Sequence, residues 1–180
     1  RFTADSQFDT TAAYGDVMLT NGTLDAEVSL PAQVVRLRIL NAEIERAYDL
    51  GFSDGRTFHV IATDGGLVNA PIPVTRLRMF VGERAEILVD LSKDAPGSSL
   101  DLQAFNGGQP FGFPGGEEAQ SGDFGSLLNN KTFDVLHVNV AEKTAGAIEA
   151  VPAKLADNVY WTEADVTNSR AAVVTAELGK

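Results

Sequence analysis

The sequence predicts an all-β fold, an antiparallel β-sandwich or barrel, and three observations support this prediction. First, several segments alternate apolar and polar residues with the two-residue period of a half-buried strand. Second, glycine, asparagine, aspartate and proline residues that favour turns separate these segments. Third, no stretch sustains the 3.6-residue period of an amphipathic helix. The expected strands are residues 34–40, 56–63, 83–91, 99–105 and 132–141.

The first expected strand, residues 34–40 (VVRLRIL), shows the alternation most simply. Its apolar face consists of Val35, Leu37 and Ile39. Arg36 and Arg38 lie on the other face, where they can pair across the sheet with Glu86 and Asp90 of the strand at 83–91. A single helical turn is plausible after this strand, over residues 42–48, but it is too short to change the fold class.

The remaining expected strands repeat the pattern with different side chains. In residues 56–63 the apolar face holds Phe58, Val60 and Ala62, with Thr57, His59 and Ile61 opposite. In residues 83–91 the apolar face is Ala85, Ile87, Val89 and Leu91. Residues 99–105 (SLDLQAF) and 132–141 (TFDVLHVNVA) show the same alternation.

The expected turns have specific local causes. Asn21-Gly22 suits a tight hairpin turn with positive φ angles, and Gly82 lets the chain turn into the strand at 83–91. Asp64, which precedes two glycines, is expected to fix a turn through its own side chain. Pro71 and Pro73 are counted among the turn formers.

Two stretches interrupt the strand pattern and suggest the domain organisation. Residues 106–125 are rich in glycine and predict a long, mobile loop, whose Phe111 and Phe113 are expected to pack against a neighbouring domain. The sandwich is expected to occupy residues 1–150. Residues 151–180 are expected to be a linker followed by the first strand of a further, truncated domain, at residues 169–178.

Composition and charge exclude several classes of function. The 25 acidic residues outnumber the 14 basic ones and give a net charge of −11, which disfavours nucleic acid and anionic membranes as partners. No apolar run approaches the length of a membrane span. The absence of cysteine excludes disulfides, thiolate metal sites and thiol nucleophiles.

No group of residues in the sequence predicts an active site. His59 and His137 are the only histidines, and each stands alone on its expected strand, so a structural role is favoured for both. The carboxylate pairs, Glu43 with Glu45 and Glu117 with Glu118, are expected to be solvated surface charge. There is no phosphate-binding glycine motif and no nucleophile motif. We therefore predict no catalytic, cofactor-binding or metal-binding residues, and an isolated chain without activity.

Four segments in order resemble a known family: GDVMLTNG (15–22), VVRLRILNAEIERAYDLGF (34–52), HVIATDGGLVNAPIPVTRLRMFVGERAEILVDL (59–91) and DVLHVNV (134–140). The set resembles the middle cupredoxin-like domain of three-domain multicopper oxidases, which include laccases and cuprous oxidases. The resemblance implies a cupredoxin-like Greek-key β-sandwich with flanking cupredoxin domains in the same polypeptide. It also implies copper bound by those flanking domains and none on this chain, and an extracytoplasmic location, in the periplasm, cell wall or outside the cell.

Three functions remain open at this point. The chain can belong to an oxidase that couples one-electron oxidation of a phenol-like substrate or metal ion to the reduction of dioxygen to water. It can belong instead to a copper-free relative that serves as an envelope scaffold. The third alternative is an independent binding module that uses the loop at 106–125. The ordered set of segments disfavours the third, and the oxidase is favoured over the scaffold because copper-bearing members are the commoner form.

Overall fold

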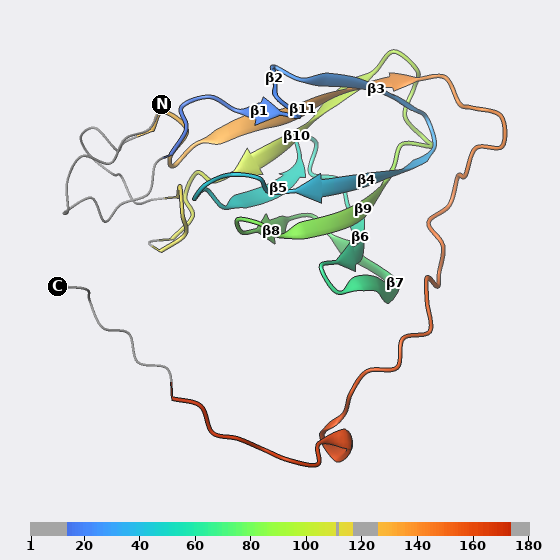
Figure 1. The fold of residues 1–180 in the computed structure, drawn as a ribbon. Helices are drawn as coiled ribbons and strands as arrows, with labels where there is room; N and C mark the ends of the chain where they lie inside the picture. Colours follow the sequence, from blue (N-terminus) through green and yellow to red (C-terminus); the bar gives the residue numbers. More distant parts are fainter. Residues whose placement is uncertain (1–13, 111, 117–125, 174–180) are drawn as a thin grey trace.

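Two β-sheets pack face to face in the computed structural model, which describes residues 14–110, 112–116 and 126–173 (Figure 1). One sheet has the strand order β3-β11-β10-β5-β8, the other has the order β4-β9-β6-β7, and β1 and β2 form a separate hairpin. All strand pairs are antiparallel except β3 with β11. The bounds are β1 Leu19–Thr20, β2 Thr23–Leu24, β3 Glu27–Pro31, β4 Val34–Leu40, β5 Tyr48–Phe52, β6 Phe58–Thr63, β7 Gly66–Val74, β8 Leu77–Met79, β9 Arg84–Asp90, β10 Ser99–Phe105 and β11 Thr132–Ala141, with a 3-10 turn, η1, at Glu163–Asp165.

The all-β prediction is confirmed, and the five predicted strands correspond to β4, β6, β9, β10 and β11. Within the described ranges the only helical segment is η1, so none has the length and hydropathy that a membrane-spanning helix requires. Four of the strands that were not predicted lack a visible two-residue pattern. Strands β1, β2 and β8 are two or three residues long. Every residue of β5 is buried, so this strand has no polar face to mark it.

Strand β7 contradicts the assignment of Pro71 and Pro73 to a turn. Both prolines lie inside this nine-residue strand, which is at the edge of its sheet. Proline has no amide hydrogen to donate to a neighbouring strand, and an edge strand tolerates that loss because one of its sides is unpaired. The prolines therefore mark a sheet edge.

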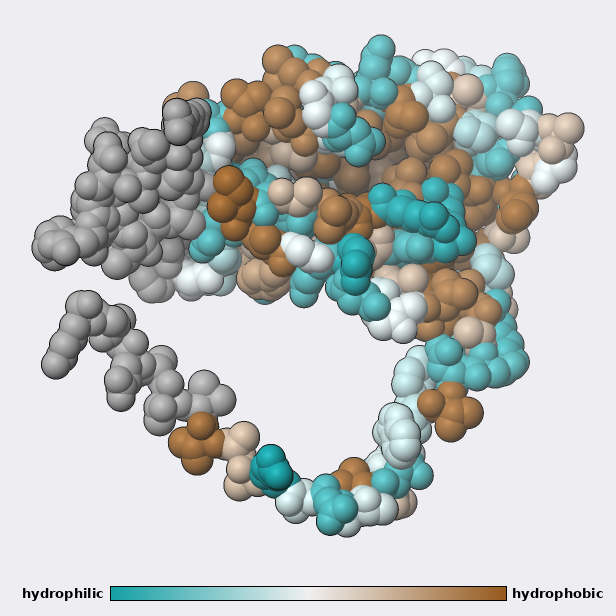
Figure 2. Space-filling model, in the orientation of Figure 1, coloured by the Kyte–Doolittle hydropathy of each residue, from teal (hydrophilic) through white to brown (hydrophobic). Residues whose placement is uncertain are grey.

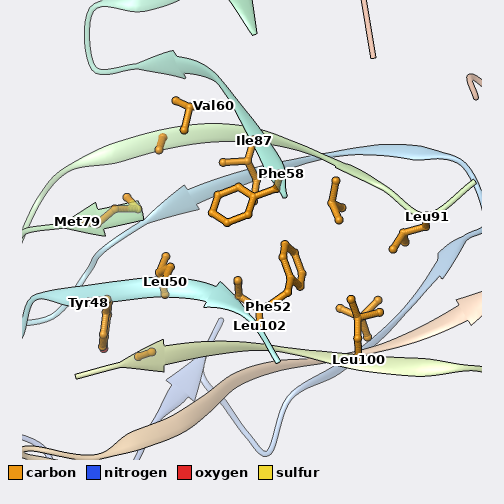
Figure 3. Close-up of a cluster of buried hydrophobic side chains, with 14 of the residues drawn as sticks. Tyr48, Leu50, Phe52, Phe58, Val60, Met79, Ile87, Leu91, Leu100 and Leu102 are labelled. Carbon is orange, nitrogen blue, oxygen red and sulfur yellow. The ribbon is translucent and has the colours of Figure 1, made fainter. Parts of the chain in front are cut away.

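The hydrophobic core lies between the two sheets (Figure 3). Phe52 of β5 and Phe58 of β6 face each other across it, with ring centroids 5.6 Å apart and an interplanar angle of 79°. The edge-to-face arrangement brings the positive ring edge onto the negative face. Sixteen buried side chains form the cluster: Ala32, Tyr48, Leu50, Phe52, Phe58, Val60, Met79, Ala85, Ile87, Val89, Leu91, Leu100, Leu102, Ala104, Val138 and Val140.

Strand β6 departs from the predicted alternation at one residue. Phe58, Val60 and Ala62 are buried as predicted, but Ile61 is buried as well, at 3% exposure. The pairing of β6 with both neighbouring strands shifts register between Val60 and Ala62. Such a bulge breaks the two-residue period, and this is why two successive residues are buried there.

The predicted turns at Asn21-Gly22 and Gly82 are confirmed. Asn21 and Gly22 have φ angles of 51° and 77° and join β1 to β2, as expected of a two-residue hairpin turn. Gly82 has a φ of 83°, and its amide donates to the carbonyl of Asn41 just before β9 begins.

Two of the predicted side-chain roles are wrong. Asp64 is exposed, and its carboxylate accepts hydrogen bonds from the backbone amide and the Nε of Arg84 on β9, at 3.2 and 2.6 Å, so it ties its turn to another strand instead of capping its own. Arg36 and Arg38 both pair with Glu86, as predicted, but Asp90 does not join them. Its carboxylate accepts instead from the amide of Ser92, because Asp90 is opposite Val34 in the strand register.

The helical turn considered for residues 42–48 does not form. Residues 41–47 are irregular, and Tyr48 already belongs to β5. The buried side chain of Asn41 accounts for this: its Nδ2 donates to the carbonyls of Arg46 and Met79, and its Oδ1 accepts from the amide of Glu43. These bonds offer the backbone partners that a helix would otherwise supply.

Of the loop predicted at 106–125, the structure describes residues 106–110 and 112–116. No strand occurs among them, in agreement with the prediction. Phe111 lies outside the described residues. Phe113 is 5% exposed and packs against Phe80 of this same domain, with ring centroids 6.0 Å apart, so its expected role in contacting a neighbouring domain is wrong.

The segment that follows β11 stays attached to the sandwich up to Asn158. The carbonyl of Ile148 accepts from the amide of Val34, next to the start of β4. Further along, the carbonyl of Asn69 on β7 accepts from the amides of Leu155 and Ala156, and Asn158 Nδ2 donates to the carbonyl of Leu67 at 2.6 Å. Beyond this point residues 159–173 run away from the sandwich (Figure 1). Residues 169–173 form no strand, and the rest of the strand predicted at 169–178 lies outside the described residues.

These contacts lead to a prediction about truncation. Deleting residues 159–180 is expected to leave the unfolding temperature nearly unchanged. The bond from these residues to the rest of the described chain is a long one, from Asn158 Nδ2 to the hydroxyl of Tyr160 at 3.3 Å, and their other bonds join them to one another. Deleting residues 151–180 is expected to lower the free energy of unfolding by about 1–2 kcal/mol, since hydrogen bonds to Asn69 and Leu67 are lost. Thermal unfolding of both truncated chains checks this. Equal stability of the two would mean that the contacts at β7 contribute nothing.

Candidate functional site

The two histidines lie on different sheets. His59 is on β6, opposite Leu88 of β9 and Pro73 of β7, and His137 is on β11. The Nδ1 of His59 is buried and has no hydrogen-bond partner among the described residues. This placement keeps the two imidazoles apart, and the structural role favoured for each histidine stays a prediction.

His137 is hydrogen-bonded to an aspartate on the neighbouring strand, and the two form an ion pair when the imidazole is protonated. Its Nδ1 is 2.6 Å from Oδ1 of Asp101, its partner in the β10–β11 register. The hydrogen bond to Asp101 raises the pKa of His137, partial burial opposes this, and the charges of Asp101 and Glu27 with a hydrogen bond to Asn139 raise it further. The stabilisation is fully present below the unfolded pKa and is lost as the pH rises through the higher pKa of the folded state.

Replacing Asp101 by asparagine is therefore expected to lower the pKa of His137. Asparagine keeps the shape of the side chain but removes the charge that favours the imidazolium. An NMR titration of the imidazole resonances measures the shift, and the resonances of His59 at one fixed pH report whether the fold is intact. An unchanged pKa of His137 would show that Asp101 is not its main partner.

The His137–Asp101 pair borders a groove of about 380 Å³ between the β1–β2 hairpin and β11. Asp101 and Gln103 alternate along β10 with the buried Leu100 and Leu102, so they point away from the core. The groove is lined by Asp16, Val17, Met18, Thr23, Leu24, Asp25, Ala26, Asp101, Leu128, Phe133, Asp134, Val135, Leu136 and His137. Figure 2 shows hydrophobic residues on the surface over the part of the molecule where the hairpin lies.

A second polar cluster, centred on Arg46, lies inside the domain. Arg46 is completely buried. Its Nη2 donates to the carbonyl of Gly15 at 3.0 Å and to Ser126 Oγ at 2.9 Å, and its Nη1 donates to Asn129 Oδ1. The guanidinium also lies 5.1 Å from the ring centroid of Tyr14. One side chain thus joins the segment before β1 to the segment before β11.

Among the described residues, the nearest carboxylate to the charge of Arg46 is that of Glu43, which does not form a hydrogen bond with it. Its Nε makes no hydrogen bond within the described part of the chain and lies 3.9 Å from Oε1 of Glu43. Burial lowers the pKa of Arg46, while the negative charge of Glu43 acts in the opposite direction. The remaining carboxylate of the first predicted pair, Glu45, takes part in none of these contacts, and Glu117 and Glu118 lie outside the described residues.

The described residues do not fit a copper site. Among them, no three His, Cys, Asp or Glu side chains gather closely enough to hold a metal ion. His59 and His137 are separated by the core, and the sequence has no cysteine to supply a thiolate. Copper in proteins favours several imidazole or sulfur ligands at one point.

Sequence reasoning missed both the groove and the Arg46 cluster. Each is assembled from segments far apart in the chain, such as residues 14–18, 101 and 126–137, so local patterns carry no signal of either. One partial indication of the groove was present in the sequence, because the polar residues of β10 and β11 could be assigned to the outward face of predicted strands.

Comparison with known proteins gives consistent results at the level of the family. The sequence profile of the multicopper oxidase family matches residues 6–99. Among solved structures, the McoA multicopper oxidase 2F4 variant from Aquifex aeolicus has a TM-score of 0.68 and 25% identity, covering 84% of this chain and 30% of that one. The laccase-like multicopper oxidase CueO from Ochrobactrum sp. has a TM-score of 0.62 and 30% identity, covering 80% of this chain and 28% of that one.

Curated relatives carry a different name. A cell division protein FtsP from Sodalis glossinidius is 51% identical over 79 residues, which are 44% of this chain and 17% of that protein. FtsP from Proteus mirabilis is 38% identical over 109 residues, which are 61% of this chain and 22% of that protein. The chain therefore matches about a fifth of the length of these relatives.

Proposed function

The chain belongs to the multicopper oxidase family, and from this premise we propose that it is a cupredoxin-like structural domain, residues 1–150, of a longer protein. In this proposal residues 151–180 lead from the domain towards a further one, and flanking cupredoxin domains of the same polypeptide are its partners. The domain would separate and orient its neighbours and carry no active site. One observation supports the proposal most: the two histidines lie on different sheets, and no other metal-ligating cluster occurs among the described residues.

Copper loading of the chain tests this function. The 180-residue chain is expected to retain far less than one copper per molecule after loading and desalting, because it offers single imidazoles only. Metal analysis by mass spectrometry measures the ratio, and the variants His59→Ala and His137→Ala serve as controls. One tightly held copper that is lost in either variant would contradict the structural role.

For the whole protein, the family supports an oxidase. The multicopper oxidases from Aquifex aeolicus and Ochrobactrum sp. are 25% and 30% identical to this chain. In that case copper ligands would come from the flanking domains, and the protein would oxidise a phenol-like substrate or a metal ion with dioxygen.

The higher identities support a second candidate, a copper-free envelope scaffold that acts in cell division. The relatives named as cell division proteins reach 51% identity over their matched part, which exceeds the identity to the solved oxidases. We favour this candidate for that reason. Both candidates place the protein outside the cytoplasm, which fractionation of cells can test.

One experiment on the full-length protein separates the two candidates. The scaffold predicts a purified protein without stoichiometric copper and without oxidation of a phenol above background, and a division defect when its gene is removed. The oxidase predicts bound copper and consumption of dioxygen, with normal division.

A further inference from the structure

The groove beside β11 is the strongest unassigned surface of the molecule. It begins where a strand is missing from one side of β11: β3 pairs with His137–Ala141, while residues 132–136 have β10 on one side only. On the other side lies the β1–β2 hairpin, which Thr20 attaches to β11 by donating a hydrogen bond from Oγ1 to the carbonyl of Val135. No strand pairs with this part of the edge among the described residues. The groove is therefore the space between the hairpin and this part of the sheet edge, which no strand of the described chain pairs with.

The dimensions of the groove fit a short extended segment. Five consecutive residues of β11, from Phe133 to His137, line it. At about 3.4 Å per residue, these residues extend over roughly 14 Å, which is the length of four to five residues of extended peptide. A bare metal ion would leave most of the space unfilled, and the described residues include no group of three ligands that could hold one.

The lining of the groove combines apolar walls with a strongly negative charge. Eight of the lining residues are apolar: Val17, Met18, Leu24, Ala26, Leu128, Phe133, Val135 and Leu136. Four are aspartates, Asp16, Asp25, Asp101 and Asp134, and no lysine or arginine lines the groove. Leu24 is 56% exposed, so part of the apolar wall is accessible to a partner.

Contacts within the domain leave this charge largely uncompensated. Asp16 accepts from the amide of Leu127 and Asp134 accepts from Gln103 Nε2, both at 2.8 Å, and neither donor is charged. Two positive groups act on lining aspartates: His137, when protonated, on Asp101, and the buried Arg46 on Asp16. Neither contacts Asp25 or Asp134 through a hydrogen bond. A groove of this kind attracts a ligand that carries positive charge on an apolar body.

We propose that this groove is a docking site for an extended peptide segment of another protein, in which lysine or arginine alternates with an apolar residue. The basic side chains would lie near Asp25 and Asp134, and the apolar ones against Leu24 and the exposed part of the hairpin. This site is independent of the structural role proposed above, which stands whether or not the groove binds a partner.

Fluorescence anisotropy with the 180-residue chain tests the proposal. The probe is a labelled five-residue peptide that alternates valine and lysine, with both ends blocked, and the matched probe has glutamine in place of lysine. The lysine peptide is expected to bind and the glutamine peptide to bind more weakly. Asp25→Asn and Asp134→Asn are each expected to weaken binding about two- to fivefold, the size of an exposed ion pair. Asparagine suits position 25, where φ is 47°.

The control variant is Asp157→Asn, which removes the same charge from an exposed residue of the linker. It is expected to leave binding unchanged, while Leu24→Ala weakens it through the apolar wall. Thermal unfolding shows that each variant is folded. Equal binding of both peptides, an equal effect of Asp157→Asn, or no binding would overturn the proposal. Displacement of the peptide by n-butylamine with the same affinity would also overturn it and mark a site for small cations.

Discussion

Replacement of Arg46 by methionine is expected to lower the free energy of unfolding by about 3–5 kcal/mol, the cost of removing one member of a buried charged network. Methionine fills a similar volume but donates no hydrogen bond. The carbonyl of Gly15 would lose its bond to the guanidinium, and Asn129 Oδ1 would be left inside without a donor. The attachment of the segment before β1 to the segment before β11 would be weakened, and the bonds from Ser126 Oγ to the carbonyl of Gly15 and from the amide of Leu127 to Asp16 would remain.

Denaturant unfolding of Arg46→Met and of a matched surface variant measures this effect. Arg38→Met is the control, because Arg38 has a side chain 75% exposed and pairs with Glu86 at 3.3 Å. It is expected to change stability by no more than about 0.5 kcal/mol. Arg46→Lys should recover only part of the loss, since one ammonium group cannot reach Gly15, Ser126 and Asn129 in the geometry of the guanidinium. A stable Arg46→Met variant would show that the cluster contributes little to the fold.

Replacement of Phe58 by alanine is expected to lower the free energy of unfolding by a comparable 3–5 kcal/mol, because it leaves a cavity between the two sheets. Phe58 is fully buried and meets Phe52 edge to face in the centre of the core (Figure 3). Phe58→Leu should cost less, since leucine fills most of the same space.

The matched control for Phe58 is Phe80, which is 45% exposed. Phe80→Ala removes the same atoms from a site that water already reaches and is expected to cost about 1 kcal/mol, mainly through its contact with Phe113. Denaturant unfolding of the three variants checks the order. If Phe80→Ala lowered the free energy of unfolding as much as Phe58→Ala, packing around Phe80 and Phe113 would contribute as much to stability as the core between the sheets.

The sequence was sufficient to predict the strands that have one buried and one exposed face. In β4 and β10 the polar members, such as Arg36 and Gln103, reach solvent while their neighbours pack inside, so the period of two is visible. Strand β5 is buried throughout, including Asp49, and its pattern disappears. Asp49 is tolerated there because its amide donates to Asn106 and its carboxylate accepts from Gln109, partners that lie beyond residue 100.

The candidate sites were less predictable than the strands because they depend on which segments meet. The sequence spacing of the two histidines left open whether they meet in space, and the structure places them on different sheets. Arg46 was not identified, because a buried arginine looks the same in sequence as an exposed one until its acceptors, Gly15 and Asn129, are known. The groove depends on where β3 begins along β11, and this register has no local signature.

The parallel pairing of β3 with β11 has a consequence for how the chain folds. His137 pairs with Glu27, so the last strand of the sandwich must find one of the first before the five-stranded sheet is complete. Bringing such distant segments together requires closing a long loop, and folding rates fall as the average sequence separation of native contacts increases. During synthesis on a ribosome, β3 would remain unpaired until β11 has been made, when nearly all of the domain has emerged. We therefore expect slow folding and a need for protection of that edge in the newly made chain.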